Sequence, residues 1–442
     1  MNLNNGSFNN NNKNNSNSVL VGFEIYMKEW CSIEELYAAY KDCRKHKTSS
    51  YSCANFERKE LSNLQKLCDD LNNHTYEIGR SDAFCVTRPK VREVFAAQFR
   101  DRIVHHFVIM KTIHLFEAHF IQDTYNCRKG KGTDYGVQRC LEFSREFADG
   151  WVAKCDIQGF FMSIERVRVA NDLEVFLRER YEGADIEHLL WLVRLIVLNA
   201  PEYNCRKKGN VKLWRLLPRS KSLFTNRKGY GFAIGNLTSQ IYANFALCPL
   251  DLRMVSLPNI RYGRYVDDFY IYGRTLEDVT TSIQVARDEL NNLSLSLHPK
   301  KVYIQPVFHG VTFIGTHIKQ GRIYSSQRTV GNATNLVRFF NSFKGKEQHI
   351  ESFTQRFNSY SGYLSHRLTY AIRWNLWNLL SEEVKQFVYM ENMRVLKVKE
   401  KYKANVKLIK KLHDKKKICK RRVGSDSTSL YERRESALLP TR

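Results

Sequence analysis

The residues best suited to chemistry are the adjacent carboxylates Asp267 and Asp268, which lie among apolar and aromatic residues of high strand propensity. Burying ionised carboxylates beside such a run is costly unless a positive charge compensates them, and a divalent cation is the simplest one. A tight hairpin over 261–272 would expose both side chains at its tip. The pair therefore predicts a Mg²⁺ site, and a solvated acidic turn is the alternative interpretation.

A third carboxylate, Asp156, lies near the end of an apolar strand predicted over 152–157. Three carboxylates can bridge two metal ions about 3.5–4 Å apart, which together activate a hydroxyl and stabilise a departing pyrophosphate. Mg²⁺ suits this task because it keeps coordination positions for substrate phosphates, and Mn²⁺ is the alternative ion. We expect Phe160 to pack in the core. A Phe161 ring beneath the sugar would exclude a 2′-hydroxyl and select deoxyribonucleotides, with core packing as the alternative.

The stretch 231–240 is a loop that leads into a helix predicted from 236. Gly235 would let the backbone approach a ligand closely, and the helix N-terminus offers N–H donors. Ile234, Gly235 and Gln240 are therefore candidate substrate-binding residues. An ordinary loop-to-helix junction is the alternative.

Three cations are candidates for phosphate chemistry. Lys90 and Arg92 would face the same side of a strand, if one extends that far, and could hold a triphosphate together. Lys301, beside Lys300, could protonate the departing pyrophosphate. A solvated surface charge is the alternative for each of them.

The composition limits the class of protein. The chain has 442 residues, 43% of them apolar, and a net charge of +25, which favours a polyanion such as nucleic acid as its partner. No uncharged apolar run of about 18 residues appears, so no membrane partner is expected. The N-terminus does not resemble a secretory signal, and eleven scattered cysteines form no Cys-x-x-Cys pair, which favours the cytoplasm.

The order of predicted elements indicates an α+β fold, because helices and strands mix without strict alternation. Helices are predicted over 27–45, 91–120, 166–198, 236–252, 276–293 and much of 329–393, with a capping box at Ser32 and Glu35. Strands and turns are predicted over 76–90, 152–157, 301–306 and 311–318. The basic stretch 394–422 carries a thin apolar stripe that is typical of a helix.

Together, these motifs resemble those of reverse transcriptases across about 76–375. YVDD at 265–268 resembles their acidic hairpin, Asp156 with Phe160 and Phe161 resembles their first metal-binding strand, and GVTFIG at 310–315 resembles their primer-gripping hairpin. The resemblance implies a right-hand polymerase with fingers, a palm built on an antiparallel sheet, and a helical thumb. The expected parts are a disordered Asn-rich leader (1–18), fingers and N-terminal helices (19–150), palm (151–320, with a fingers insertion at about 166–230), helical thumb (321–393) and a basic C-terminal extension (394–442).

A narrower resemblance comes from the spelling Ile234-Gly-Asn-Leu-Thr-Ser239-Gln240, preceded by WRLLP at 214–218 and KSLF at 221–224. It is similar to reverse transcriptases of diversity-generating retroelements, although Ala233 stands where that family usually has Pro. Those enzymes misincorporate opposite template adenines and act with a small basic accessory protein that forms a pentameric barrel.

The resemblance implies template RNA, a primer, cDNA and dNTPs as partners. Ile234 lacks the amide of the Gln found in most reverse transcriptases, so one source of discrimination would be absent. A reverse transcriptase of another bacterial lineage, antiphage or group II intron-related, is one alternative. An inactive palm that serves as an RNA-binding scaffold is the other.

Overall fold

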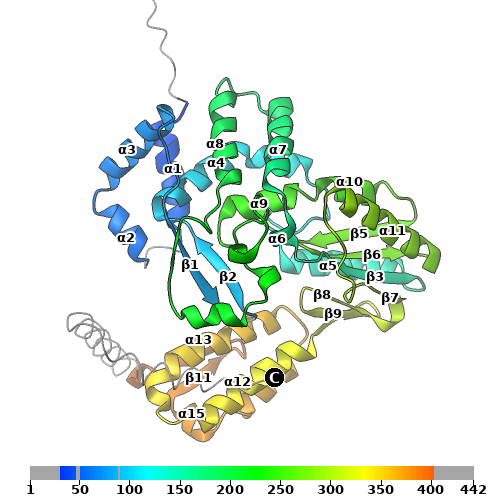
Figure 1. The fold of residues 1–442 in the computed structure, drawn as a ribbon. Coiled ribbons are helices and arrows are strands. Elements are labelled where there is room, and N and C mark those ends of the chain that lie inside the picture. The colour runs from blue at the N-terminus through cyan, green and yellow to red at the C-terminus, as the bar shows by residue number, and fades with distance from the viewer. Residues whose placement is uncertain (1–29, 46–49, 88–89, 403–442) are drawn as a thin grey trace, which may run out of the picture. The chain divides into compact units, whose positions relative to one another are not determined.

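The computed structural model describes residues 30–45, 50–87 and 90–402, and it has the mixed α+β character that the sequence predicts (Figure 1). The expected Asn-rich leader and the tail beyond Tyr402 lie outside the described residues. The chain divides into two units, each assembled from separate stretches. The first unit comprises the chain up to Phe120, Gly159–Pro249 and Leu293–Leu295, and the second comprises Ile121–Gln158, Leu250–Asn292 and the chain from Ser296 onward.

The first unit contains a small sheet in the order β2-β1-β4 together with helices. Its strands are β1 (Ser81–Val86), β2 (Arg92–Ala96) and β4 (Cys205–Lys207), with β1 antiparallel to β2 and parallel to β4. Its α-helices are α1 (Ile33–Arg44), α2 (Tyr51–Glu57), α3 (Glu60–Asn72), α4 (Phe99–His119), α6 (Phe160–Ser163), α7 (Arg166–Arg180), α8 (Ile186–Leu198) and α9 (Leu237–Phe245). Three short 3₁₀ helices follow β4: η1 (Val211–Leu216), η2 (Arg219–Lys221) and η3 (Leu223–Thr225).

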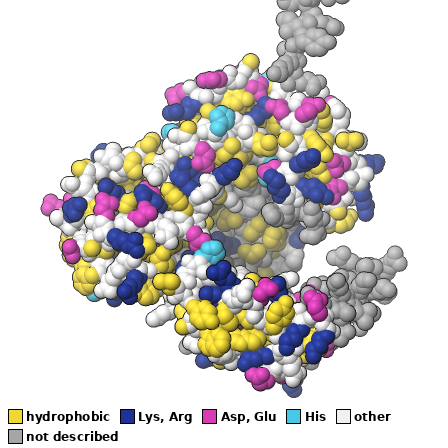
Figure 2. Space-filling view, turned by 180° about the vertical axis from the view of Figure 1, so that it is seen from behind, with side chains coloured by type: hydrophobic (Ala, Val, Ile, Leu, Met, Phe, Trp, Pro, Cys, Tyr) yellow, Lys and Arg dark blue, Asp and Glu magenta, His cyan; other side chains and the backbone are white. Residues whose placement is uncertain are grey.

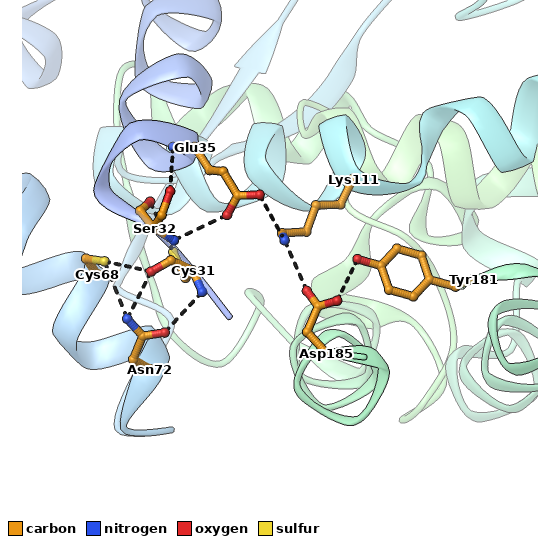
Figure 3. Close-up of polar contacts among 8 residues, drawn as sticks. All are labelled: Cys31, Ser32, Glu35, Cys68, Asn72, Lys111, Tyr181 and Asp185. Atoms are coloured by element: carbon orange, nitrogen blue, oxygen red, sulfur yellow. Dashed lines mark hydrogen bonds and ion pairs between the residues drawn. The ribbon is translucent and has the colours of Figure 1, made fainter. Parts of the chain in front are cut away.

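Polar contacts fasten the N-terminal helices of this unit to its centre (Figure 3). The predicted capping box is present, because the Ser32 hydroxyl accepts from the Glu35 N–H and the Glu35 carboxylate accepts from the Ser32 N–H. The same Glu35 carboxylate lies 3.2 Å from Lys111 Nζ, and Asp185 lies 3.0 Å from that nitrogen. Lys111 on α4 therefore joins the start of α1 to the residue before α8.

The second unit is built on an antiparallel sheet in the order β5-β6-β3-β7. Its strands are β3 (Trp151–Asp156), β5 (Ile260–Tyr265), β6 (Asp268–Gly273) and β7 (Tyr303–Pro306). The helix α11 (Leu276–Asn292) packs against β3 and β6, and α5 (Thr133–Glu146) packs against β5. The helix α10 (Cys248–Val255) crosses from the first unit into the second. On one face of the sheet, Tyr270 and Tyr272 pack with α5 residues in one buried cluster.

The rest of the second unit is a hairpin sheet followed by helices. The sheet contains β8 (Val311–Phe313), β9 (Thr316–Lys319) and β10 (Arg322–Ser325). The elements that follow it along the chain are α12 (Gln327–Ser342), α13 (Lys346–Ser365), α14 (Tyr370–Asn378), α15 (Glu382–Phe387), β11 (Val388–Glu391) and β12 (Val395–Val398). A separate core joins these helices, and within it the rings of Phe340 and Phe353 stack 4.0 Å apart. Figure 2 shows hydrophobic side chains gathered over part of this region. Its exposed large apolar side chains include those of Leu368, Tyr370 and Trp374.

Three helix predictions need correction. The helix expected over 91–120 begins only at Phe99, because 92–96 form β2, in which Glu93 and Phe95 are buried on the same side. The helix expected over 166–198 is two helices, since α7 ends at Arg180 and α8 starts at Ile186. The helix expected from 236 is likewise divided into α9 and α10.

The prediction of a helix from 394 is wrong for 394–399, whereas 400–402, the last described residues, are helical. Residues 395–398 form β12, which pairs with β11 in a hairpin. Leu396 and Val398 lie in the same core as the preceding helices, and Tyr402 packs against it. The basic extension expected from 394 therefore begins inside a packed hairpin. The hairpin over 261–272 and the helix over 276–293 are confirmed to within one residue.

Candidate active site

The pairing of β3 with β6 brings two of the three predicted carboxylates together. Asp156, the last residue of β3, is the direct cross-strand partner of Asp268, the first residue of β6. Directly opposed residues of an antiparallel pair project from the same face of a sheet, with Cβ atoms about 4.5–5.5 Å apart. Asp267 is the preceding turn residue, and its carbonyl accepts from the Ile157 N–H at 3.0 Å. Residues more than a hundred positions apart thus meet at one strand end.

The turn between β5 and β6 has a strained backbone. Val266 and Asp267 form a two-residue loop, and Val266 has a φ of 60°. Two-residue hairpin loops favour a positive φ at this position and usually place Gly or Asn there, whereas a β-branched residue is rare. Such strain persists only where the surroundings hold it. Here the buried amide oxygen of Asn126 accepts from the Val266 N–H at 2.9 Å.

A buried ion pair supports the turn from below. The Arg264 guanidinium is fully buried, pairs with the buried Asp251 carboxylate through two nitrogens, and donates to the Val266 carbonyl at 2.9 Å. Asp251 also accepts from the Tyr262 hydroxyl at 2.8 Å and from the Thr124 hydroxyl at 3.2 Å. The carboxylate therefore has several donors, which a buried charge requires. This network fixes the turn that carries Asp267.

The electrostatics of the strand end make one carboxyl group unusual. Burial, opposed by the ammonium of Lys154 and assisted by the charges of Asp267 and Asp156, raises the pKa of Asp268 to about 6. Lys154 Nζ lies 3.1 Å from Asp268 Oδ1. Burial and neighbouring negative charges both disfavour ionisation of a carboxyl group. The site thus concentrates negative charge that a cation would relieve.

A second ammonium reaches the other strand. Lys301 Nζ lies 2.8 Å from Asp156 Oδ1, and the loop that carries it is fixed because the His298 N–H donates to the Asp156 carbonyl at 2.8 Å. Lys301 was predicted as a site residue, but Lys154 was missed. The signal for it was present, because residues two apart on a strand face the same side, which puts Lys154 beside Asp156.

The carboxylates suit magnesium by chemistry and position. Hard divalent cations prefer carboxylate oxygens, and Asp156, Asp267 and Asp268 provide three at one strand end. Within the described part of the chain, however, no group of three acidic, His or Cys side chains has the arrangement of a metal cluster. Asp156 and Asp268 are each engaged by a lysine ammonium instead. Side-chain rotation at these carboxylates would accompany cation binding.

The other predicted site residues belong to the first unit, where the loop 231–235 joins two segments. The Phe232 N–H donates to the Phe161 carbonyl at 2.7 Å, and the Phe95 N–H on β2 donates to the Ile234 carbonyl at 2.9 Å. Gly235 has a φ of 125°, and a Cβ there would lie 2.9 Å from the Phe95 carbonyl oxygen. Close approach to β2 therefore requires a glycine at this position.

The remaining candidates differ in exposure. Phe160 is buried, as predicted for a core residue, whereas Phe161 is half-buried. Gln240 is exposed on α9. Arg92 is the exposed first residue of β2, and Lys90 lies two residues before that strand, so the argument that both face one side of a strand does not reach Lys90.

Sequence reasoning also missed a buried carboxylate beside Arg92. The carboxylate of Glu93, 2% exposed, accepts from Trp214 Nε1 at 2.7 Å, from the Ser222 hydroxyl at 2.8 Å and from the Leu223 N–H at 2.8 Å. These three donors are neutral and come from the segment that contains η1 to η3. Glu93 therefore fastens this segment to β2.

Comparison with known proteins agrees with this geometry. The family described as "Reverse transcriptase (RNA-dependent DNA polymerase)" matches residues 88–318, which is more than half of the chain and includes all three aspartates and Lys301. The chain belongs to the reverse transcriptase family. It is accordingly an RNA-directed DNA polymerase, whose partners include template nucleic acid and dNTPs and whose family generally uses divalent metal ions. No curated protein matches the chain. No described helix has both the length and the apolar composition needed to cross a bilayer.

Proposed function

We propose that the chain makes cDNA from an RNA template by two-metal nucleotidyl transfer at the end of β3 and β6. Asp156 and Asp267 would be the principal metal ligands, and Asp268 would support them. The single observation that supports this best is the register that pairs Asp156 with Asp268 next to the turn that carries Asp267. The raised pKa of Asp268 adds to it, since neighbouring carboxylates that share a site are a mark of metal-dependent chemistry.

The magnesium ions, when bound, would acidify the primer 3′-hydroxyl and stabilise charge on the departing pyrophosphate. The chain's own residues would do the rest. Lys301 would hold a proton for the leaving pyrophosphate, and Lys90 with Arg92 would hold the triphosphate through charge-assisted contacts. The half-buried ring of Phe161 would lie beneath the sugar and exclude a 2′-hydroxyl.

An Asp267→Asn variant tests the metal assignment. Incorporation of dNTPs on a primed RNA template should fall to background, while affinity for the RNA stays near that of the unmodified protein. Asp149→Asn, at an exposed aspartate outside the turn, is the matched control and should retain full incorporation. Normal incorporation by the Asp267→Asn protein would remove Asp267 from the chemistry.

We propose further that the enzyme is a right-hand polymerase of the diversity-generating type, error-prone at template adenines. The fingers would comprise 19–150 with an insertion at about 166–230, the palm 151–320 and the thumb 321–393, in the cytoplasm. The support is the spelling from Ile234 to Gln240 and the half-buried apolar side chain at Ile234. A small basic accessory protein that forms a pentameric barrel would be its partner, and Gly235 and Gln240 would complete the nucleotide contact.

Sequencing the cDNA made from a template that contains all four bases tests this subtype. Errors should concentrate opposite adenine, and Ile234→Gln should reduce them by restoring an amide that can bond the incoming nucleotide. Ile234→Val, which keeps the side chain apolar, should not reduce them. Errors spread evenly over the four bases would favour a reverse transcriptase of another bacterial lineage, antiphage or group II intron-related. RNA binding with no incorporation at all would favour an inactive scaffold.

A further inference from the structure

A strongly basic and largely exposed part of the first unit is the segment 205–228, here called the basic segment. It contains no Asp or Glu, and its Lys and Arg residues are Arg206, Lys207, Lys208, Lys212, Arg215, Arg219, Lys221, Arg227 and Lys228. It starts in β4 beside β1, and η1 also contacts β1 (green in Figure 1). The catalytic assignment uses none of these side chains.

The basic segment is held in place mainly by contacts that do not involve its cationic side chains. Glu93 accepts from three of its neutral donors, and the Lys208 N–H donates to the Ala83 carbonyl at 2.8 Å. Leu223 is buried in a small core with Ala83, Phe95 and Ala233. These contacts order the backbone without most of the cationic side chains, which leaves most of their charges available.

Some of the cations have partners within the fold. Arg206 and Lys208 both pair with Asp82, at 3.0 Å for Arg206. The Lys207 ammonium lies 4.0 Å from the centroid of the Phe224 ring, and Arg227 lies over the Tyr230 ring at 4.5 Å. These contacts explain four of the nine basic side chains.

The other five are exposed and form no ion pair with any residue that the structure describes. They are Lys212, Arg215, Arg219, Lys221 and Lys228. Like charges crowded in one short segment repel each other, so the arrangement is unfavourable unless a polyanion binds it. Val211 and Leu216, which are 54% and 61% exposed, lie among these cations. Cations interleaved with exposed apolar groups suit a single strand, whose unstacked bases need apolar contact as well as phosphate neutralisation.

We propose that the basic segment is a binding surface for single-stranded nucleic acid and holds the template strand through its phosphates. The identity of the strand as RNA template rests on the proposed function, but the binding chemistry does not. Glu93 is the positioning residue that keeps the segment on β2.

Fluorescence anisotropy with the full-length protein tests the proposal. The probe is a labelled single-stranded RNA, titrated at several salt concentrations in EDTA and without dNTPs, so that no catalysis contributes. The test variant carries Lys212→Gln, Arg215→Gln, Arg219→Gln and Lys221→Gln. Each phosphate contact to a single strand contributes about 0.7 to the slope of log K against log salt, so the slope should fall by about 3. Affinity at about 0.1 M salt should fall by two to three orders of magnitude.

The matched control removes the same charge from another exposed surface of the first unit. It carries Lys41→Gln, Arg58→Gln, Lys59→Gln and Lys66→Gln, and its slope should stay within 1 of the unmodified value. Equal losses in both variants would mean that only net charge matters, which would overturn the proposal. A larger loss on a duplex RNA probe than on the single strand would overturn it too.

Binding and primer extension together distinguish failure of the binding surface from failure of the polymerase mechanism. The Asp267→Asn protein should bind the probe with an unchanged slope, because the metal ligands take no part in binding in EDTA. An unchanged slope in the neutralised variant, with normal primer extension by the unmodified protein, would overturn the binding surface alone. Loss of slope in that variant, with no extension by the unmodified protein, would support the surface and contradict the polymerase mechanism.

Discussion

The turn that carries Asp267 and the basic segment stabilise their charged side chains in opposite ways. In the turn, a fully buried Arg264–Asp251 pair lies beneath a strained backbone, and the carboxylates above it are engaged by lysines. In the basic segment, one buried carboxylate, Glu93, is satisfied by neutral donors, and five cations are left unpaired among the described residues. An ion pair therefore fixes the backbone of the turn, whereas the backbone of the basic segment is fixed while most of its own cationic side chains stay unpaired among the described residues.

This difference follows from the chemistry expected of each region. Nucleotidyl transfer requires oxygens placed within tenths of an ångström, so the turn needs a rigid, fully satisfied support. Binding a flexible phosphate backbone requires available charge more than exact placement.

Removing the guanidinium beneath the turn should have the largest effect. Arg264→Met leaves the Asp251 carboxylate buried without its cation and should lower the free energy of unfolding by about 3–5 kcal/mol. Arg261→Met, at an exposed position of the same strand, should lower it by less than about 1 kcal/mol. Urea denaturation measures both. Equal losses would mean that the buried pair gives the turn no special support.

Weakening the hydrogen bonds between Glu93 and the basic segment should have the next largest effect. Glu93→Gln loses the charge that strengthens three hydrogen bonds and turns an amide N–H₂ toward donors, which should cost about 2–3 kcal/mol. Trypsin should then cleave faster after Arg215, Arg219 and Lys221, because the segment leaves β2 more often. Glu182→Gln, at an exposed acid of the same unit, is the control. Unchanged cleavage in the Glu93→Gln protein would show that Glu93 does not hold the segment.

The two regions also show what the sequence could predict. The hairpin, the α11 helix and the capping box at Ser32 were predictable because their patterns are local. Asp156 and Asp267 could be found because acidic residues at the ends of apolar strands are unusual. Asn126, Asp251 and Glu93 could not, since each acts through a partner more than ten residues away.

The sequence-based predictions also missed two strands. Residues 92–96 resemble a helix because Glu and Ala favour helices, but pairing with β1 and burial of Phe95 outweigh that preference. Residues 395–398 sit in a lysine-rich stretch with a helical apolar stripe, yet they pair with β11. In both cases a tertiary contact decided between two local patterns of similar strength.

Acid should affect the first unit through a buried neutral histidine. Burial, together with the smaller effects of the charges of His106 and Arg102, lowers the pKa of His105 to about 4, and its Nδ1 lies 2.7 Å from the Thr238 hydroxyl. A depressed pKa gives stability that is present above about 6.5 and is lost as pH falls toward 4. Between pH 7 and pH 5 this loss should be about 2 kcal/mol.

Comparing unfolding free energies at the two pH values isolates this residue. His105→Gln should remove about 2 kcal/mol of the pH dependence, whereas His114→Gln, at an exposed position of the same helix, should not. At pH 7 the His105→Gln variant should be no more stable than the unmodified protein, because the substitution changes the buried hydrogen bond to Thr238. A pH dependence that persists in full in His105→Gln would place the titrating group elsewhere.

The smallest expected effect on stability tests whether the strained turn also needs a neutral contact. Asn126→Ala removes the acceptor of the Val266 N–H and should cost about 1–2 kcal/mol of unfolding free energy, because that donor is partly buried. Asn378→Ala, at an exposed site in α14, should cost less than about 0.5 kcal/mol. A merely structural role for Asn126 would leave kcat unchanged in the folded fraction. If Asn126 instead holds the backbone that carries Asp267, kcat should fall by about tenfold or more while KM for dNTP changes little. The substrate would still bind, but its reacting atoms would be misaligned with Asp267.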